Sequence, residues 1–423
     1  MIKKLTLTAF ACVLMFQSLV AQENLKLMFY NLLNFPSETA VPNRLDQLQL
    51  ILDDYKPDLF MVCELNNQNG ANSILNVMQF LNPDYQNATF QLNTSDDSGG
   101  NQNDLQQLIY YDSSKFILES QTIVTTIFRD FNHYKLKLNS INQGTNPVFL
   151  DVIVCHLKAS QGEDNEDFRL EMVQDLTTYL NTFPASSNII LAGDFNIYRS
   201  SEPAFQEIID TANDNSIKFE DPADRIGNWH TNPSYIDVFT QSTRTQSGLG
   251  GSTGGFDDRF DFIMTSSFMM VGNPELSYVS DSYAAYGNNA NSNCFNREIN
   301  SSNCSGTDYS FTIRDALYHF SDHLPVTLEL QTNQSLSIPD FSEEQAITIL
   351  GTNIVNDILK LRAKPSLINN WSLSLFNNIG QLVKTVDVNN TLISIDATQF
   401  ANGIYYITSS KFQFKPLKFV VAH

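Results

Sequence analysis

The stretch Ile189-Ile190-Leu191-Ala192-Gly193-Asp194-Phe195-Asn196 joins an apolar run directly to a carboxylate and an amide. Its apolar residues show no clean polar alternation, which is typical of a β-strand covered on both faces. A single polar side chain at the end of such a strand is ordinarily a cap or a turn residue. Asp194 and Asn196 are therefore candidates for a functional site only if other strands of the chain end in the same way.

Polar side chains do stand at the ends of other apolar runs. They are Asn31, Glu64, His156 and, ahead of its strand rather than behind it, the pair Asp322-His323. Side chains at the ends of neighbouring strands converge at one edge of a sheet, where α/β proteins place their sites. Carboxylate and amide oxygens suit Mg²⁺, Mn²⁺ or Ca²⁺, and imidazoles can hold and neutralise a phosphate. The pattern indicates metal-assisted chemistry on a phosphate.

The body of the chain alternates strand-like and helix-like segments. The apolar runs rich in β-branched and aromatic residues are 27–30, 58–63, 108–111, 148–154, 189–192, 260–264 and 326–330. Between them, segments 44–55 and 167–179 carry apolar residues at the three- and four-residue spacing of a helix. Strands that alternate with helices predict a layered α/β domain.

The N-terminus is typical of a secretory signal peptide. Lys3 and Lys4 precede an apolar run that ends in a small residue, Ala21, before Gln22. The alternative is a single membrane anchor, but the run contains polar residues and has only the minimum length of a spanning helix. No other stretch is apolar enough to span a membrane, so we expect a soluble, exported, monomeric mature protein.

The charge balance limits how the protein can meet a polyanion. The chain carries 25 Lys and Arg against 46 Asp and Glu, a net charge of −21. Such a body repels nucleic acid at long range and offers few bases for counterion release. If the substrate is a nucleic acid, the attraction must be local, and bound cations are the obvious source.

The cysteines fit an exported protein. Cys294 and Cys304 lie in a Ser/Asn-rich stretch and are expected to form a disulfide in an oxidising compartment. Cys63 and Cys155 end apolar runs and are expected to be buried small hydrophobic residues. No Cys/His spacing suggests structural zinc.

Two loop-like regions and a repetitive tail complete the organisation. Residues 248–255 are Gly/Ser-rich, and residues 280–310 are dense in Asn, Ser, Tyr and Gly. Long loops of this kind are usually functional or mobile. After a proline-containing linker, short β patterns recur at 357–361, 371–376, 382–386, 392–395, 404–408 and 418–421, which predicts a small β-sandwich.

Several motifs together resemble the endonuclease/exonuclease/phosphatase superfamily, which includes deoxyribonuclease I, apurinic endonucleases and bacterial sphingomyelinases. The strongest are Gly193-Asp194-Phe195-Asn196 and Ser321-Asp322-His323-Leu324-Pro325. The others are Tyr30-Asn31, Pro57-Asp58 leading to Glu64, His156-Leu157 and Arg259-Phe260-Asp261-Phe262-Ile263. They occur in the family's order over nearly the whole body. The resemblance implies a four-layer α/β sandwich, in which helices flank two packed β-sheets.

The resemblance also implies roles. Glu64 would bind a divalent cation, most naturally Mg²⁺, with Asn31 and Asp322 beside it. In the catalytic set, Asp194 would orient or deprotonate the attacking water, and Asn196 would hold a phosphate oxygen. His323 would contact the scissile phosphate, and Asp261 would orient that histidine. His156 would be a second histidine of the site.

The sequence departs from the family pattern in two respects. Deoxyribonuclease I-like enzymes pair the second histidine with a Glu, but the stretch here is Asn103-Asp104-Leu105-Gln106-Gln107, so the partner is Asp104, a Gln, or absent. No Lys/Arg-rich insertion of the apurinic-endonuclease kind is present. Arg129 and Arg169 remain as phosphate contacts or as solvated helix charges.

The tail resembles the C-terminal sorting domain of the type IX secretion system. The matching motifs are Asn356-Asp357-Ile358-Leu359-Lys360-Leu361, the segment 375–383, Asn402-Gly403-Ile404-Tyr405-Tyr406 and Lys418-Phe419-Val420. The usual Pro-Asn-Pro is replaced by Thr352-Asn353-Ile354-Val355. A carbohydrate-binding or adhesion sandwich is the alternative. The expected organisation is a signal peptide at 1–21, a catalytic domain at 22–331, a linker at 332–341 and a sorting domain at 342–423.

These features predict a secreted or surface-attached nuclease, with nucleic acid and the type IX secretion machinery as partners. A sphingomyelinase-like hydrolase of small phosphodiesters is an alternative, kept open by aromatic residues near Tyr283, Tyr286 and Phe295 that would suit a membrane surface. A non-catalytic surface module is a second alternative. It is disfavoured because nearly every expected chemical group is present.

Overall fold

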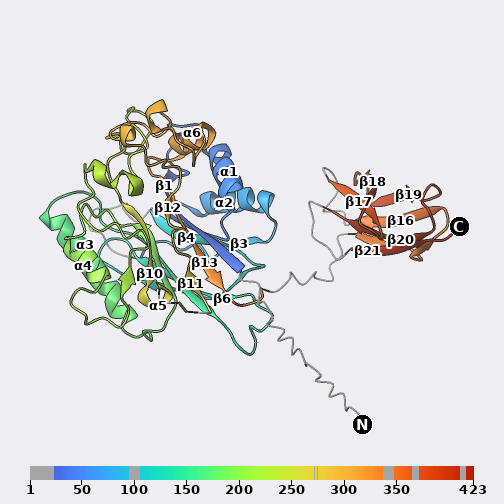
Figure 1. Cartoon of the computed structure of the whole chain (residues 1–423), viewed down its shortest axis with the longest axis horizontal. Helices are drawn as coiled ribbons and strands as arrows, with labels where there is room; N and C mark the ends of the chain where they lie inside the picture. The colour runs from blue at the N-terminus through green and yellow to red at the C-terminus, as the bar shows by residue number, and fades with distance from the viewer. Residues whose placement is uncertain are drawn as a thin grey trace, which may run out of the picture. The chain divides into compact units, whose positions relative to one another are not determined.

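The structure, a computed structural model, describes residues 23–94, 105–270, 272–273, 275–336, 347–363, 371–409 and 416–423. The expected signal peptide, Asp104 and residues 337–341 of the expected linker lie outside these ranges. The chain divides into two compact units, Met1–Ser337 and Ile338–His423 (Figure 1). None of the helices within the described ranges is both long and apolar enough to cross a membrane.

The first sheet of the larger unit is seven-stranded and mixed. Its path is β11-β13-β1-β2-β4-β3, with β12 also paired to β13. The central strands β1 and β2 are parallel, whereas β13 and β4 run antiparallel to them. The strands are β1 (Glu23–Phe35), β2 (Leu59–Leu65), β3 (Tyr85–Asn87), β4 (Gln106–Asp112), β11 (Ser277–Tyr278), β12 (Ala284–Ala285) and β13 (Val326–Thr332).

The second sheet is six-stranded, in the order β5-β6-β7-β8-β10-β9. Its strands are β5 (Phe116–Val124), β6 (Phe131–Leu138), β7 (Phe149–His156), β8 (Ile189–Asp194), β9 (Phe219–Glu220) and β10 (Asp261–Ser266). The parallel pair β7 and β8 places His156 beside Asp194, and the antiparallel pair β8 and β10 places Asp261 on the other side of Asp194. Three predicted site residues therefore lie side by side in the register of this sheet.

Helices cover the outer faces of the two sheets. Figure 1 shows α3 (Glu163–Leu180) and α4 (Pro203–Ile208) on the opposite side of the strands from α1 (Arg44–Tyr55) and α2 (Gln68–Leu81). A further helix, α6 (Phe311–Phe320), packs against α1. One apolar cluster runs through both sheets and the inward faces of these helices. The predicted four-layer α/β sandwich is confirmed, and the helix predicted at 167–179 begins earlier, at Glu163.

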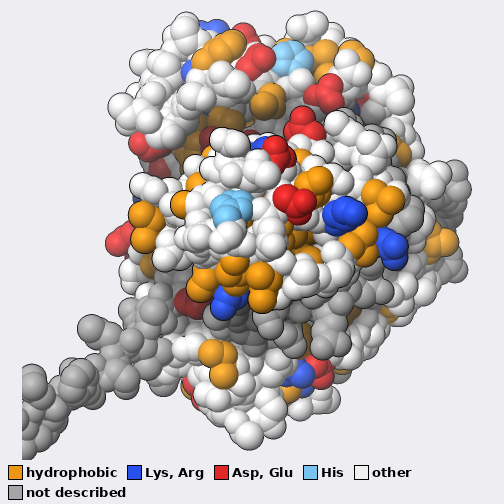
Figure 2. All heavy atoms as spheres, turned by 90° about the vertical axis from the view of Figure 1, so that its right-hand side faces the viewer, with side chains coloured by type: hydrophobic (Ala, Val, Ile, Leu, Met, Phe, Trp, Pro, Cys, Tyr) orange, Lys and Arg blue, Asp and Glu red, His pale blue; other side chains and the backbone are white. Residues whose placement is uncertain are grey.

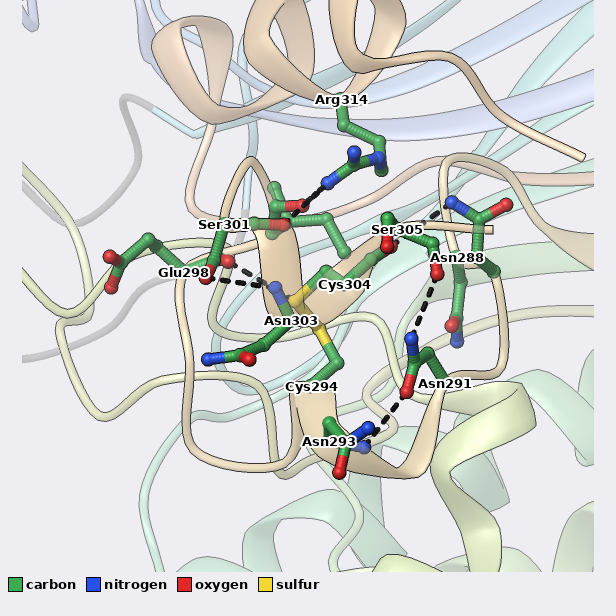
Figure 3. The surroundings of a disulfide bond; sticks show 12 residues. Asn288, Asn291, Asn293, Cys294, Glu298, Ser301, Asn303, Cys304, Ser305 and Arg314 are labelled. Atoms are coloured by element: carbon green, nitrogen blue, oxygen red, sulfur yellow. Dashed lines mark hydrogen bonds between the residues drawn. A yellow bond between two sulfur atoms is a disulfide. The ribbon is translucent and has the colours of Figure 1, made fainter. Parts of the chain in front are cut away.

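The loop regions contain their own ordered structure. Short turns η3 (Ser292–Cys294) and η4 (Ser302–Cys304) bring Cys294 and Cys304 together in the predicted disulfide (Figure 3). Cys63 and Cys155 are buried and free, as expected. The remaining short elements are η2 (Pro233–Val238) and α5 (Ser267–Met270).

The smaller unit is all-β, as predicted. One sheet has the order β14-β16-β19 and the other has the order β15-β21-β20-β17-β18. Alternating residues point into a separate apolar core that contains Trp371, Leu373 and Phe419. The strands are β14 (Ile347–Ile349), β15 (Ile354–Val355), β16 (Ile358–Ala363), β17 (Ser372–Asn377), β18 (Leu382–Asp387), β19 (Leu392–Asp396), β20 (Gly403–Thr408) and β21 (Leu417–Val421).

Candidate active site

All eight residues singled out in the sequence meet at one end of the sandwich. A cavity of about 360 Å³ is lined by six of them, Glu64, His156, Asp194, Asn196, Asp322 and His323. Asn31 and Asp261 lie beneath it, fully buried, and each is hydrogen-bonded to a lining residue. Strand ends from both sheets supply the set, because β1, β2, β7 and β8 all end here.

Asn31 links two carboxylates. Its Nδ2 donates to Glu64 Oε1 and to Asp194 Oδ2, both at 3.0 Å, and its Oδ1 accepts from the backbone N–H of Leu33 at 3.0 Å. The second oxygen of Glu64 accepts from the backbone N–H of Asn34 at 2.9 Å. In this orientation Asn31 presents its nitrogen, so metal ligation through Asn31 requires its amide to turn over.

Asp322 is approached closely by the Gly/Ser-rich loop 248–255. Its Oδ2 accepts from the backbone N–H of Ser252 at 2.7 Å and from Gln241 Nε2 at 3.4 Å. A Cβ on Gly251 would lie 2.4 Å from the carboxyl carbon of Asp322, and Gly251 has a φ of +66°. Only glycine fits this approach without displacing the carboxylate.

His323 lies between two aspartates and a glutamine. Its Nδ1 lies 2.7 Å from Asp261 Oδ2, and its Nε2 lies 3.7 Å from Asp194 Oδ2 and 2.6 Å from Gln241 Nε2. A cationic imidazole donates from both ring nitrogens, so the amide of Gln241 must turn over to accept from it. Burial opposes charge on this imidazole, but Asp261, Asp322 and Asp194 outweigh it and raise the pKa of His323 well above its usual range. Sequence reasoning missed Gln241, which nothing in its surroundings in the sequence distinguishes from a surface amide.

Burial raises the pKa of both carboxyl groups in the centre of the cavity. Burial raises the pKa of Asp194 to about 7, although the charge on His323 lowers it in part. Burial, and then the charge of Asp322, also raises the pKa of Glu64. Asn196 donates its backbone N–H to Asp194 Oδ1 at 3.0 Å and its side-chain nitrogen to the carbonyl of Leu157 at 3.3 Å.

His156 is neutral in this environment. Its Nε2 lies 3.6 Å from Asp194 Oδ2 and 3.9 Å from Glu64 Oε1. Burial lowers its pKa well below the usual range, and the charges on Arg129 and His323 lower it further. Within the described part of the chain, neither His156 Nδ1 nor the side chain of Gln107 has a hydrogen-bond partner. His156 therefore differs in protonation from His323, although both imidazoles face Asp194.

The arginines near the site lie inside the protein and bind backbone carbonyls. Arg129 donates to His156 O at 2.8 Å and to Leu157 O at 2.5 Å, and it lines the cavity. Arg169 is fully buried, paired with Glu202 at 2.7 Å, and also donates to the carbonyls of residues 158 and 160. Neither is a solvated helix charge, and Arg169 is not exposed to a phosphate.

Two further buried arginines secure the loops at the other side of the cavity. Arg44 donates to the carbonyls of Leu33 at 3.0 Å and Phe320 at 2.8 Å. Arg244 donates to the carbonyls of Tyr318 at 2.8 Å and Leu249 at 2.9 Å. These side chains fix the backbone on which Asn31, Asp322 and the 248–255 loop are mounted.

The acidic groups fit a divalent cation. Among the described residues, no lysine or arginine forms an ion pair with Glu64, Asp194 or Asp322, and Asp322 Oδ1 is buried without a hydrogen-bond donor. Ligand atoms of Glu64, His156 and Asp194 lie within 4.8 Å of one another. Buried carboxylates are normally paired or bound to a metal. A second group with ligand atoms this close is Asp194, Asp261 and His323, and Asp322 is in neither group, so its place beside the cation is what the family resemblance implies.

The two units match two different family models. Residues 353–421 match the model of the secretion system C-terminal sorting domain, and residues 28–323 match the model of the Endonuclease/Exonuclease/phosphatase family. No curated protein matches the sequence.

The solved structures that match the chain have low sequence identity and TM-scores below 0.5. The human Nocturnin catalytic domain with bound sulfate is 15% identical, with 73% of this chain and 94% of that chain covered and a TM-score of 0.43. An endonuclease/exonuclease/phosphatase from Bacteroides vulgatus is 13% identical, with 73% and 99% covered and a TM-score of 0.45. D. rerio TDP2 complexed with a single-strand DNA product is 14% identical, with 73% and 99% covered and a TM-score of 0.44. The matched family model spans most of the catalytic unit and more than half of the chain, and the chain therefore belongs to the Endonuclease/Exonuclease/phosphatase family.

Proposed function

We propose that this protein is a secreted, divalent-metal-dependent phosphodiesterase whose substrate is nucleic acid. Its family comprises hydrolases that act on phosphoester bonds, and the sorting domain indicates secretion or attachment to the cell surface. The observation that carries the proposal is the pairing, in one cavity, of an Asp261-oriented cationic His323 with the carboxylates of Glu64, Asp194 and Asp322. Hydrolysis of a phosphodiester needs both kinds of group.

Each side chain has a distinct task in this proposal. Glu64 and Asp322, with Asn31 beside them, would hold a divalent cation, which would neutralise charge at the phosphate. Asp194, with a pKa of about 7, orients a water and accepts its proton near neutral pH. His323 donates a hydrogen bond to the scissile phosphate.

The remaining two groups complete the phosphate contacts. Asn196 offers its amide to a phosphate oxygen, and neutral His156 offers Nε2 from the neighbouring strand.

The packing of aromatic residues favours nucleic acid over a membrane lipid. Tyr286 is buried and donates to Asp54, Tyr283 contacts Arg259, and Phe295 packs against Phe239. These rings therefore do not form an exposed apolar edge of the kind that a membrane-surface enzyme inserts. On the face that it draws, Figure 2 shows lysine and arginine side chains scattered among acidic ones. We assign substrate attraction to the cavity and its cation because the chain carries 46 Asp and Glu against 25 Lys and Arg.

One experiment tests the substrate and the metal together. The mature protein is incubated with supercoiled plasmid, linear DNA, RNA and sphingomyelin vesicles, in Mg²⁺ and in excess chelator. We expect cleavage of nucleic acid in Mg²⁺ and none in chelator. Cleavage of sphingomyelin alone would favour the small-phosphodiester alternative, and inertness toward every substrate would favour a non-catalytic module.

Glu64→Gln is expected to weaken metal dependence more than any other property. A neutral amide of the same shape is a poorer ligand for a hard cation, so the Mg²⁺ activation curve should move to higher concentration. Both oxygens of Glu64 accept hydrogen bonds, from Asn31 and from the backbone of Asn34, and an amide has only one acceptor oxygen, so the metal-free protein should melt slightly earlier. An unchanged activation curve would remove Glu64 from the metal site.

A further inference from the structure

The disulfide closes a compact loop whose two arms are also joined by polar contacts (Figure 3). Cys294 and Cys304 are ten residues apart and both buried. Asn291 Nδ2 donates to the carbonyl of Ser305 at 2.8 Å, across the base of the loop. From α6, the buried Arg314 donates to the carbonyls of Ile299 at 2.7 Å and Ser301 at 2.9 Å. Residues 294–304 are therefore held together by one disulfide and several hydrogen bonds, unlike an unattached surface loop.

This disulfide-closed loop is hydrogen-bonded along its length to the segment 243–256. Three main-chain bonds join them: Ile299 N–H to Thr243 O at 2.9 Å, Phe256 N–H to Arg297 O at 3.1 Å, and Asn296 N–H to Phe256 O at 3.1 Å. The contact is close as well as bonded, because a Cβ on Gly255 would lie 2.7 Å from the carbonyl carbon of Asn296. Both ends of the segment 243–256 therefore rest on the closed loop.

The same segment holds Asp322 from two sides. Thr243 donates its backbone N–H to Asp322 O at 3.0 Å and its hydroxyl to Ser321 O at 2.6 Å. In the middle of the segment, Ser252 N–H donates to Asp322 Oδ2 at 2.7 Å. Segment 243–256 forms no helix or strand of its own, so its order depends on what it contacts.

We propose that the Cys294–Cys304 bond is a positioning element of the active site, which acts through segment 243–256 to fix the carboxylate of Asp322. The proposal rests on the assignment of Asp322 to the cation site. Opening the disulfide removes the covalent link between η3 and η4, so the loop no longer holds the carbonyls and N–H groups that bind segment 243–256 at fixed positions. A shift of about 1 Å at a group of this kind can cost roughly 100-fold in rate.

The proposal has a consequence for where the enzyme works. In a reducing cytoplasm Cys294 and Cys304 are thiols, and the site is incomplete. Outside it, a disulfide-bearing oxidant takes two electrons and two protons from the pair by thiol–disulfide exchange, and its own disulfide becomes two thiols. The carboxylate is then held in place. A nuclease built in this way is latent until it leaves the compartment that contains the cell's own nucleic acid.

The test compares Cys294→Ala/Cys304→Ala with wild type, using plasmid cleavage, calorimetric titration with Mn²⁺ and thermal melting. We expect a cooperative melt, a kcat lower by roughly 10- to 100-fold and weaker Mn²⁺ binding. Reduction of wild type should give the same values, and reductant should not change the double variant further. Asn303→Ala, at an exposed position inside the disulfide-closed loop, is the matched control and should resemble wild type.

A second pair of variants keeps the test independent of the cysteines. Thr243→Val removes the hydroxyl that donates to Ser321 and should reproduce part of the loss, whereas Thr243→Ser should restore it. A disulfide-free protein that melts earlier but keeps wild-type kcat and Mn²⁺ affinity would overturn the proposal, since the bond would then only stabilise its own loop. If wild type cleaves none of the substrates, the Mn²⁺ titration alone decides the inference, separately from the proposed function.

Discussion

His323→Ala should lower kcat by about three to four orders of magnitude while the protein stays folded, as a general acid or orienting imidazole contributes that much. His323 is the only imidazole lining the cavity that the described structure holds cationic, because Asp261, Asp322 and Asp194 together outweigh its burial. Asp261→Asn should lower kcat nearly as much, because the amide keeps the shape of the side chain but loses the negative charge that orients the ring and keeps it protonated.

The matched control is a second Asp–His pair outside the cavity. His230 Nδ1 lies 2.7 Å from Asp258 Oδ1, the same contact as in the His323–Asp261 pair, but His230 does not line the cavity. His230→Ala should keep kcat within a few-fold of wild type. Circular dichroism and melting curves confirm folding. Near-normal turnover by a well-folded His323→Ala protein would show that the catalytic assignment is wrong.

Asp194→Asn should reduce kcat by roughly three orders of magnitude and, in metal-free buffer at pH 7, raise the melting temperature. Burial raises the pKa of Asp194 to about 7, above the value of about 3.9 for an unfolded aspartate. The folded state therefore binds a proton that the unfolded state has released, and stability falls as pH rises from about 4 to 7. The amide carries no charge and removes this cost.

Two measurements separate the parts of this prediction. Single-turnover cleavage at saturating Mg²⁺ reports the rate, and melting curves between pH 4 and 8 report the linkage. Asp167→Asn, on the exposed face of α3, is the control and should change neither. A lower melting temperature in metal-free Asp194→Asn would mean that Asp194 is ionised and stabilising in the native site.

The strand ends could be predicted from sequence because their information is local. An apolar strand followed by Glu64, His156 or Asp194 fixes both the element and the side of the sheet on which the polar group emerges. Two sheets stacked in one domain then bring those ends together. The roles assigned to the side chains remain predictions that the experiments above address.

The loop contributions could not be predicted in the same way. Gln241 and Ser252 touch Asp322, which follows them by 81 and 70 residues, through backbone geometry that no short pattern encodes. The burial of Arg169 was also unforeseen, because its position on a helix is equally typical of a solvated charge. What decides is the buried carboxylate of Glu202, together with the carbonyls of residues 158 and 160, which the fold places around the guanidinium.

Arg44 and Arg244 place two buried positive charges in the interior of the catalytic unit. Burial lowers the pKa of Arg44 only to about 10, so it stays protonated at neutral pH, and its donors reach neutral carbonyl dipoles rather than carboxylates. Burial lowers the pKa of Arg244 as well, and the charge of Asp322 offsets part of the lowering in both arginines, which places them within its field. Positive potential in a low-dielectric interior is little weakened by mobile ions. On a protein of formal charge −21, these two buried arginines offset part of the negative charge of the cavity carboxylates, and a map of exposed residues would omit them.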